Sequence, residues 1–156
     1  MCIRDRYRRV MDKNLRREII IDAYQNPHNR GLVDDSSYLT NKQASESCID
    51  NLDFMMKIED NIVKDIRFDG EACAISTSAT SIMIDTLIGK NIEEVEKILK
   101  NYYNMVQEEE YNSEVLGDLV VFDEIYKQPN RKKCALLPGV AIKAMLDKLE
   151  VENGRK

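Results

Sequence analysis

The sequence has no tryptophan, and its 156 residues include one histidine, three prolines and six glycines. No apolar run approaches the roughly 18 residues that a membrane-spanning helix needs, and the charged N-terminus has no apolar secretory-signal segment. The 23 basic residues are outnumbered by 28 acidic ones and form no stripe with interleaved aromatic side chains. We therefore expect a cytoplasmic protein with no membrane or nucleic-acid partner.

Common catalytic and nucleotide-binding motifs are also missing. There is no P-loop, no dinucleotide-binding glycine pattern and no Ser-His-Asp arrangement. His28 lies in a Pro-Asn-Gly turn that is far from every cysteine in sequence, so a Cys–His pair would depend on the fold bringing the two together.

The chain does have four cysteines. Cytosolic thiols stay reduced, so these cysteines indicate metal binding or catalysis before they indicate disulfides. Residues 1–10 resemble a translated sequencing leader, and we expect them to be non-native or disordered. Met11 is then the native start, residues 11–156 form a single domain, and Cys2 has no function.

The other three cysteines are each expected where a helix or strand begins. Cys48 is followed two positions later by Asp50, while Cys73 and Cys134 lie 25 and a further 61 positions along the chain. Three thiolates and one carboxylate could complete a tetrahedral zinc site or hold an iron–sulfur cluster. Each cysteine taken alone is more often a small buried apolar residue. Ligands so far apart in sequence need a folded domain to bring them together.

Local charge adds to this interpretation. Cys73 and Cys134 are both predicted at helix starts, where the helix dipole favours a thiolate. Arg131 and Lys133 place positive charge beside Cys134 and are candidate supporting residues.

Hydrophobic periodicity predicts an α+β fold: a small antiparallel sheet of about three strands with helices packed on one face. Alternating runs at 51–58 and 62–69, joined by a polar turn, predict a hairpin. A third strand is expected from the region 33–39. Helices are predicted at 15–25, 74–88, 92–105 and 116–126, with a final one that Cys134 opens. Asn91 is expected to cap the helix at 92–105, and Pro129 is expected to break the one at 116–126.

Four ordered motifs carry a resemblance to a known family. Residues 26–31 resemble the Asn-Pro-x-Asn-x-Gly turn of the IscU/SufU (NifU N-terminal-like) iron–sulfur cluster assembly family. Residues 48–50, 70–81 and 131–137 are similar to its three cysteine elements. The resemblance covers about residues 15–149. Ile49 replaces the family's glycine between the first Cys and Asp, which predicts a stiffer loop there.

Three departures from the IscU pattern resemble the SufU branch. The second and third cysteines are 61 positions apart, Lys133 rather than histidine precedes Cys134, and residues 128–132 replace a chaperone-recognition segment. Membership of this branch implies Zn²⁺ and the acceptance of persulfide sulfur from a PLP-dependent, SufS-like cysteine desulfurase. Other SUF cluster-assembly proteins are further expected partners.

The resemblance implies a metal site formed by Cys48, Asp50, Cys73 and Cys134, with Cys48 as the sulfur acceptor. The chain would then be a sulfur-transfer accessory protein rather than a stand-alone enzyme. The same ligands could hold Fe²⁺ or a transient [2Fe–2S] cluster, so a cluster scaffold is the alternative function. A domain with a purely structural zinc is the third.

Overall fold

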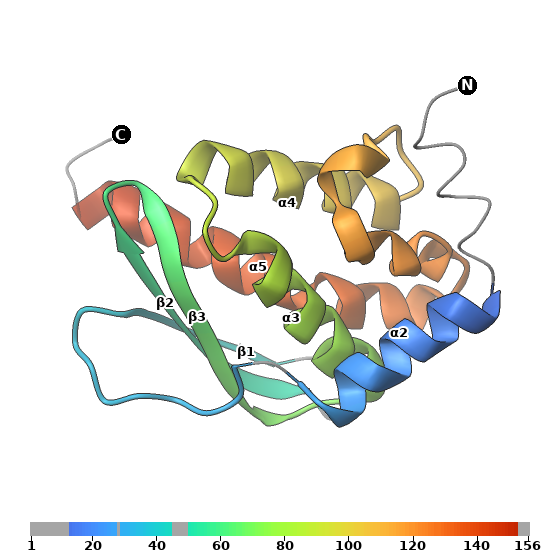
Figure 1. Cartoon of the computed structure of the whole chain (residues 1–156), viewed down its shortest axis with the longest axis horizontal. Coiled ribbons are helices and arrows are strands. Elements are labelled where there is room, and N and C mark those ends of the chain that lie inside the picture. Colours follow the sequence, from blue (N-terminus) through green and yellow to red (C-terminus); the bar gives the residue numbers. More distant parts are fainter. Residues whose placement is uncertain (1–12, 28, 45–49, 153–156) are drawn as a thin grey trace.

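The computed structural model describes residues 13–27, 29–44 and 50–152 (Figure 1). Its elements in chain order are α2 (Lys13–Gln25), β1 (Leu39–Ala44), β2 (Asn51–Glu59), β3 (Ile62–Glu71), α3 (Ala74–Leu87), α4 (Ile92–Val106), the 3₁₀ turns η1 (Ser113–Val115), η2 (Gly117–Phe122) and η3 (Ile125–Lys127), and α5 (Pro129–Glu152). The strands form an antiparallel sheet in the order β1-β2-β3, and the helices lie on one of its faces. The predicted α+β fold is confirmed.

The hairpin between β2 and β3 follows directly from its sequence. Asp60 and Asn61 form a two-residue turn in which both φ angles are positive, at 54° and 66°. Two consecutive residues with positive φ form a type I′ turn, whose twist matches that of the two strands it joins. Asp and Asn tolerate positive φ better than most residues. The register then pairs Phe54 with Phe68, and both side chains are almost completely buried.

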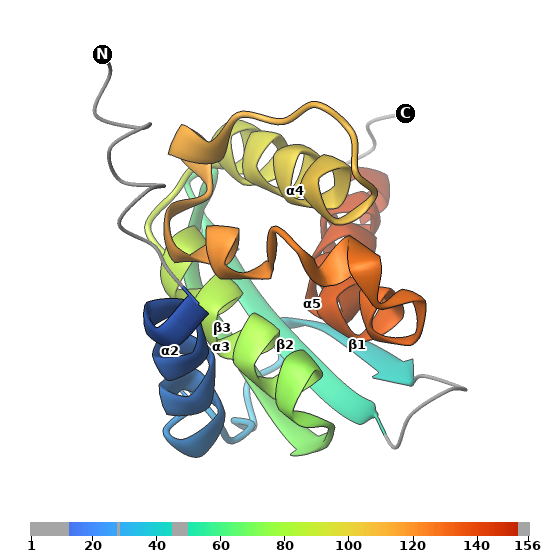
Figure 2. The same ribbon diagram turned by 90° about the vertical axis from the view of Figure 1, so that its right-hand side faces the viewer.

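The helical layer is organised around α3, as Figure 2 shows. Helix α2 packs on one side of α3 and α5 on the other, while α5 also covers β1 and part of β2. The α3 sequence, AISTSATSIMIDTL, is rich in small side chains, which allow neighbouring backbones to approach closely. This arrangement places the start of α3 next to the first turns of α5.

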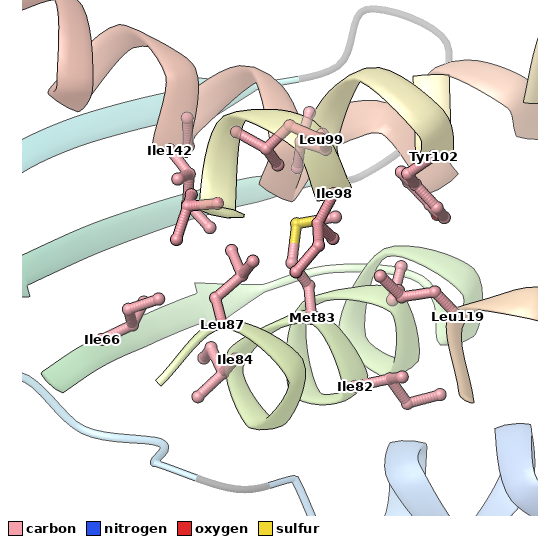
Figure 3. Packing of buried hydrophobic residues seen from close by; sticks show 14 of the residues in the cluster. Ile66, Ile82, Met83, Ile84, Leu87, Ile98, Leu99, Tyr102, Leu119 and Ile142 are labelled. Atoms are coloured by element: carbon pink, nitrogen blue, oxygen red, sulfur yellow. The ribbon is translucent and has the colours of Figure 1, made fainter. Parts of the chain in front are cut away.

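The hydrophobic core lies between α3, α4, α5 and the sheet. Met83 and Leu87 point from α3 toward Ile98 of α4 and Ile142 of α5 (Figure 3). Ile66 of β3 closes this cluster from the sheet, and its side chain is fully buried. The core therefore fixes the mutual positions of α3 and α5, and Cys73 and Cys134 lie near the N-terminal ends of these two helices.

Two expected elements differ from the structure. The edge strand is Leu39–Ala44 rather than a segment of 33–39, because the ladder with β2 begins at the pair of Leu39 with Met56. The helix expected at 116–126 is a pair of 3₁₀ turns, η2 and η3. Gly117 has a φ of 56°, which interrupts a regular right-handed helix at that point.

The final helix also begins earlier than predicted. Pro129 is its first residue rather than a breaker before it, so Cys134 lies in the second turn of α5 and does not open the helix. A proline is well suited to this position because the first N–H groups of a helix need no intrahelical partner. None of the helices in the described segments has the length and apolar character that crossing a bilayer requires.

Candidate metal centre

Three elements bring a carboxylate and two thiols together. Asp50 immediately precedes β2, Cys73 is the N-cap of α3, and Cys134 lies in the second turn of α5. One potential ligand atom from each of the three lies within 4.8 Å of the other two. Asp50 and Cys134 are buried and Cys73 is partly buried.

The hairpin register explains why Asp50 meets Cys73 although 23 positions separate them. The ladder ends with Asn51 paired to Glu71, so the residues just outside this pair emerge at the same end of the sheet. Gly70 allows the strands to close there: its φ is 125°, and a Cβ at this position would collide with the carbonyl oxygen of Asn51.

The Asp50 carboxylate is held by hydrogen bonds on both of its oxygens. Oδ1 accepts the backbone N–H of Cys73 at 2.8 Å, and Oδ2 accepts the Ser76 hydroxyl at 2.6 Å. The Cys73 thiol lies 4.0 Å from the same Oδ2. Only 2% of Asp50 is exposed, so the surrounding protein groups rather than solvent determine its orientation.

These contacts decide the charge of Asp50. Burial opposes ionisation and is the largest single influence on this carboxyl group. The hydrogen bonds from the Ser76 hydroxyl, the Cys73 N–H and the thiols of Cys134 and Cys73 together outweigh burial, so the pKa of Asp50 lies below its ordinary value. The carboxylate is therefore ionised at neutral pH and available as a metal ligand.

The two thiols occupy different backbone positions. The Cys73 sulfur accepts the N–H of Ser76 at 3.5 Å, which is a side-chain cap of α3. The Cys134 thiol lies 3.9 Å from the carbonyl oxygen of Asn130, one turn earlier in α5. Both cysteines carry thiols outside any disulfide, so both are chemically able to bind a metal.

The donor set fits a zinc ion. Zinc in proteins takes tetrahedral sulfur, nitrogen and oxygen ligands with bonds of about 2.0–2.3 Å, which places neighbouring ligand atoms roughly 3.3–3.8 Å apart. The 4.0 Å between the Cys73 sulfur and Asp50 Oδ2, and the 4.8 Å limit for the whole group, require only small side-chain movements to reach this spacing. Two thiolates and a carboxylate carry three negative charges, which a divalent cation would reduce to one.

The other residues singled out from the sequence are not among the three converging groups described above. Cys48, the fourth predicted ligand, and His28 lie outside the described residues. Arg131 and Lys133 have exposed side chains in the first turns of α5, so their supporting role stays a prediction.

Sequence reasoning did not single out Ser76, although its hydroxyl contacts the candidate ligand Asp50. Ser76 belongs to the motif around Cys73, and its spacing is the available signal: the third residue after a helix N-cap is the one that faces the cap side chain.

The chain is similar to several known proteins. The family model described as NifU-like N terminal domain matches residues 15–135. The zinc-dependent sulfurtransferase SufU of Bacillus subtilis (strain 168) is 35% identical over 89% of this chain and 94% of its own length. The iron–sulfur cluster assembly scaffold protein IscU of Thermotoga maritima is 30% identical over 85% of this chain and 92% of its own length.

A solved structure is similar as well. FiSufU from Fervidobacterium islandicum AW-1 is described as a candidate iron–sulfur cluster assembly scaffold protein for the SUF system. It superimposes with a TM-score of 0.76 at 29% identity, over 83% of this chain and 94% of that chain.

Proposed function

Because the chain belongs to the family of NifU-like N-terminal domains, we propose that it is a zinc-dependent acceptor of persulfide sulfur for iron–sulfur cluster assembly. The observation that carries the proposal is the convergence of Asp50, Cys73 and Cys134 within 4.8 Å. The 35% identity with a zinc-dependent sulfurtransferase supports the same chemistry.

In this proposal the zinc ligands are Asp50, Cys73, Cys134 and Cys48. A bound zinc ion supplies charge that keeps its cysteine ligands deprotonated near neutral pH. Asp50 is the one hard ligand among sulfurs, which makes it the natural position for ligand exchange. Cys73 and Cys134 each sit on a long helix that packs into the core, so the fold restrains both sulfurs.

Cys48 is then the sulfur acceptor, because it is the one cysteine of the four ligands that no helix start or helix turn is predicted to hold. Its thiolate attacks the terminal sulfur of the donor's cysteine persulfide. The sulfur–sulfur bond of the donor breaks, a new one forms on Cys48, and the donor cysteine leaves as a thiolate. The exchange consumes no oxidant or reductant, since one persulfide is replaced by another.

The proposed donor is a PLP-dependent cysteine desulfurase of the SufS kind. This assignment rests on the chemistry of the acceptor: a thiolate that takes sulfane sulfur needs a partner that forms a cysteine persulfide. Other proteins of a SUF-type assembly system would receive the sulfur afterwards.

The second candidate function is a scaffold for a [2Fe–2S] cluster, and one observation favours it specifically. The relative from Thermotoga maritima is an assembly scaffold, and it is similar over almost its whole length. Three thiolates and one carboxylate are also a chemically reasonable set for an iron–sulfur cargo.

Desulfurase turnover separates these functions. The zinc-loaded protein should accelerate cysteine-dependent turnover of a SufS-type desulfurase, and Cys48→Ser should abolish that acceleration. Cys2→Ser is the matched control, since it removes another thiol outside the predicted ligand set. A protein that leaves turnover unchanged, but gains iron and sulfide under anaerobic conditions, would favour the scaffold function.

A further inference from the structure

The Ser76 hydroxyl contacts all three candidate ligands of the described residues, and the Cys73 thiol donates to its oxygen at 3.7 Å. The same hydroxyl oxygen lies 2.6 Å from Asp50 Oδ2 and 3.1 Å from the backbone carbonyl oxygen of Cys134. Ser76 is completely buried, and Asp50 and Cys134 are 2% and 0% exposed. A serine hydroxyl has a single hydrogen to donate, so these two acceptors share one donor.

The chemistry of α5 explains why the Cys134 carbonyl takes a donor from another helix. In a regular α-helix this carbonyl would accept the N–H of the residue four positions later. That residue is Pro138, which has no N–H. It lies in the interior of α5 and is buried. The Ser76 hydroxyl therefore donates to a carbonyl oxygen that cannot accept a hydrogen bond from residue 138.

The neighbouring carbonyl of α5 shows the same use of side-chain donors. The hydroxyl of Tyr102, which is 1% exposed on α4, donates to the carbonyl oxygen of Ala135 at 2.7 Å. The carbonyl oxygens of Cys134 and Ala135, in the turn before Pro138, thus accept hydrogen bonds from hydroxyl groups of two other helices. The backbone around Cys134 is anchored from α3 and α4 as well as by its own helix.

We propose that Ser76 is a positioning residue of the metal centre, and that its hydroxyl also donates to the Cys134 carbonyl because Pro138 has no N–H to donate to it. One hydroxyl then aligns the Asp50 carboxylate and fixes the backbone of Cys134. This inference rests on the proposed function in that it requires Asp50 and Cys134 to bind zinc. It assigns Ser76 no contact with the metal ion or with the transferred sulfur atom.

The two tasks predict two separable effects of Ser76→Ala. Loss of the donor to Asp50 should lower zinc affinity by roughly tenfold or more, as expected for a group that orients a metal ligand. Loss of the hydrogen bonds to Asp50 and to the Cys134 carbonyl should together lower the melting temperature of the metal-free protein. Pro138→Ala restores an N–H for the Cys134 carbonyl, so it should reduce the second effect and leave the first in place.

Ser78→Ala is the matched control. Ser78 lies on the same helix, is also completely buried, and donates to the carbonyl oxygens of Ala74 and Ile75 at 2.6 and 3.2 Å. Its removal deletes the same chemical group but no contact with Asp50. Zinc affinity would be measured by competition with a chelator. The absorption spectrum of the Co²⁺-substituted protein would report the ligand geometry.

The expected result is a weaker zinc complex and a changed Co²⁺ spectrum for Ser76→Ala, in both the parent and the Pro138→Ala background, with Ser78→Ala like the parent. If Ser76→Ala folds poorly, the double variant with Pro138→Ala supplies the same readouts in a helix without its internal proline. Parent-like zinc affinity and Co²⁺ spectrum in Ser76→Ala would overturn the inference alone, provided that the parent binds zinc and accepts sulfur. A parent protein that binds no zinc would overturn the inference and the proposed function together.

Discussion

Replacing Asp50 by alanine should destabilise the metal-free protein as well as weaken its zinc site. The substitution removes the acceptor for the Cys73 N–H and for the Ser76 hydroxyl. Ser76 keeps its contact with the Cys134 carbonyl, whereas the Cys73 N–H loses its acceptor. Hydrogen bonds to a charged group contribute about 1.5–3 kcal/mol, and an unsatisfied buried donor costs about 1–3 kcal/mol.

The cost of burying the carboxylate acts in the opposite direction, because alanine has no charge to desolvate. The lowered pKa of Asp50 shows that the hydrogen bonds outweigh this cost in the folded chain. We therefore expect a net loss of about 2–4 kcal/mol in the free energy of unfolding. For a chain of this size that corresponds to roughly 5–15 °C in melting temperature.

The assay is thermal unfolding of chelator-treated, reduced protein at neutral pH, with Asp53→Ala as the control. Asp53 lies three residues further along the chain, on β2, and pairs at 3.7 Å with the exposed Lys42 amine, an ion pair that should contribute less than about 1 kcal/mol. Equal melting temperatures for the Asp50→Ala variant, the control and the parent would refute the reasoning.

The pH dependence of the same comparison provides a check on sign. A carboxyl group whose pKa is lowered on folding stabilises the protein at pH values above 3.8, the ordinary pKa of an aspartate. This contribution is lost as the pH falls through the lower pKa of the folded state. The difference between the parent and Asp50→Ala should therefore shrink in acid.

Three further predictions concern residues outside the candidate ligands. Gly70→Ala should cost about 1–3 kcal/mol in urea unfolding, because its positive φ and the nearby Asn51 carbonyl leave no room for a side chain. The hydrogen bond from the Tyr38 hydroxyl to Asp65 raises the pKa of Tyr38 to about 12. The stabilising contribution of this hydrogen bond should therefore be complete at pH values below 10.0, the ordinary pKa of tyrosine, and should be lost as the pH rises through about 12. Spectrophotometric titration should show this late ionisation move toward 10.0 in Asp65→Asn. Asn91→Ala should cost about 0.5–2 kcal/mol in thermal unfolding, because its side chain caps α4.

Local sequence patterns predicted most of the secondary structure where the periodicity is long or the turn chemistry is specific. The alternating runs on either side of Asp60 and Asn61 predicted the hairpin, and the capping pattern at Asn91 predicted the start of α4. These signals depend on neighbouring residues alone. Tertiary packing therefore leaves the elements that these signals predict unchanged.

The errors occur where a residue has two opposite local meanings. Pro129 was interpreted as the end of a helix, but a proline is equally suited to the first turn of one, and only the packing of α5 decides between the two. Pro138 lies inside that helix because hydroxyl groups from distant segments bind the carbonyls around it. Contacts of this kind cannot be inferred from spacing along the chain.

The candidate site was predictable in outline because cysteine and aspartate are distinctive ligands, and the motifs around them are similar to those of a known family. The structure brings Asp50, Cys73 and Cys134 together, and their role as metal ligands stays a prediction. The hydroxyl of Ser76 was not predicted, because serine is common at helix starts and its importance depends on a carbonyl 58 positions away.

The most direct test of the central claim is to locate the transferred sulfur. Zinc-loaded protein would be incubated with a SufS-type cysteine desulfurase and cysteine, and its peptides analysed by mass spectrometry under conditions that preserve persulfides. We expect the mass of one added sulfur atom on Cys48, with Cys73 and Cys134 unmodified. A persulfide on Cys73 or Cys134 with an unmodified Cys48, or no added sulfur on any cysteine, would contradict it.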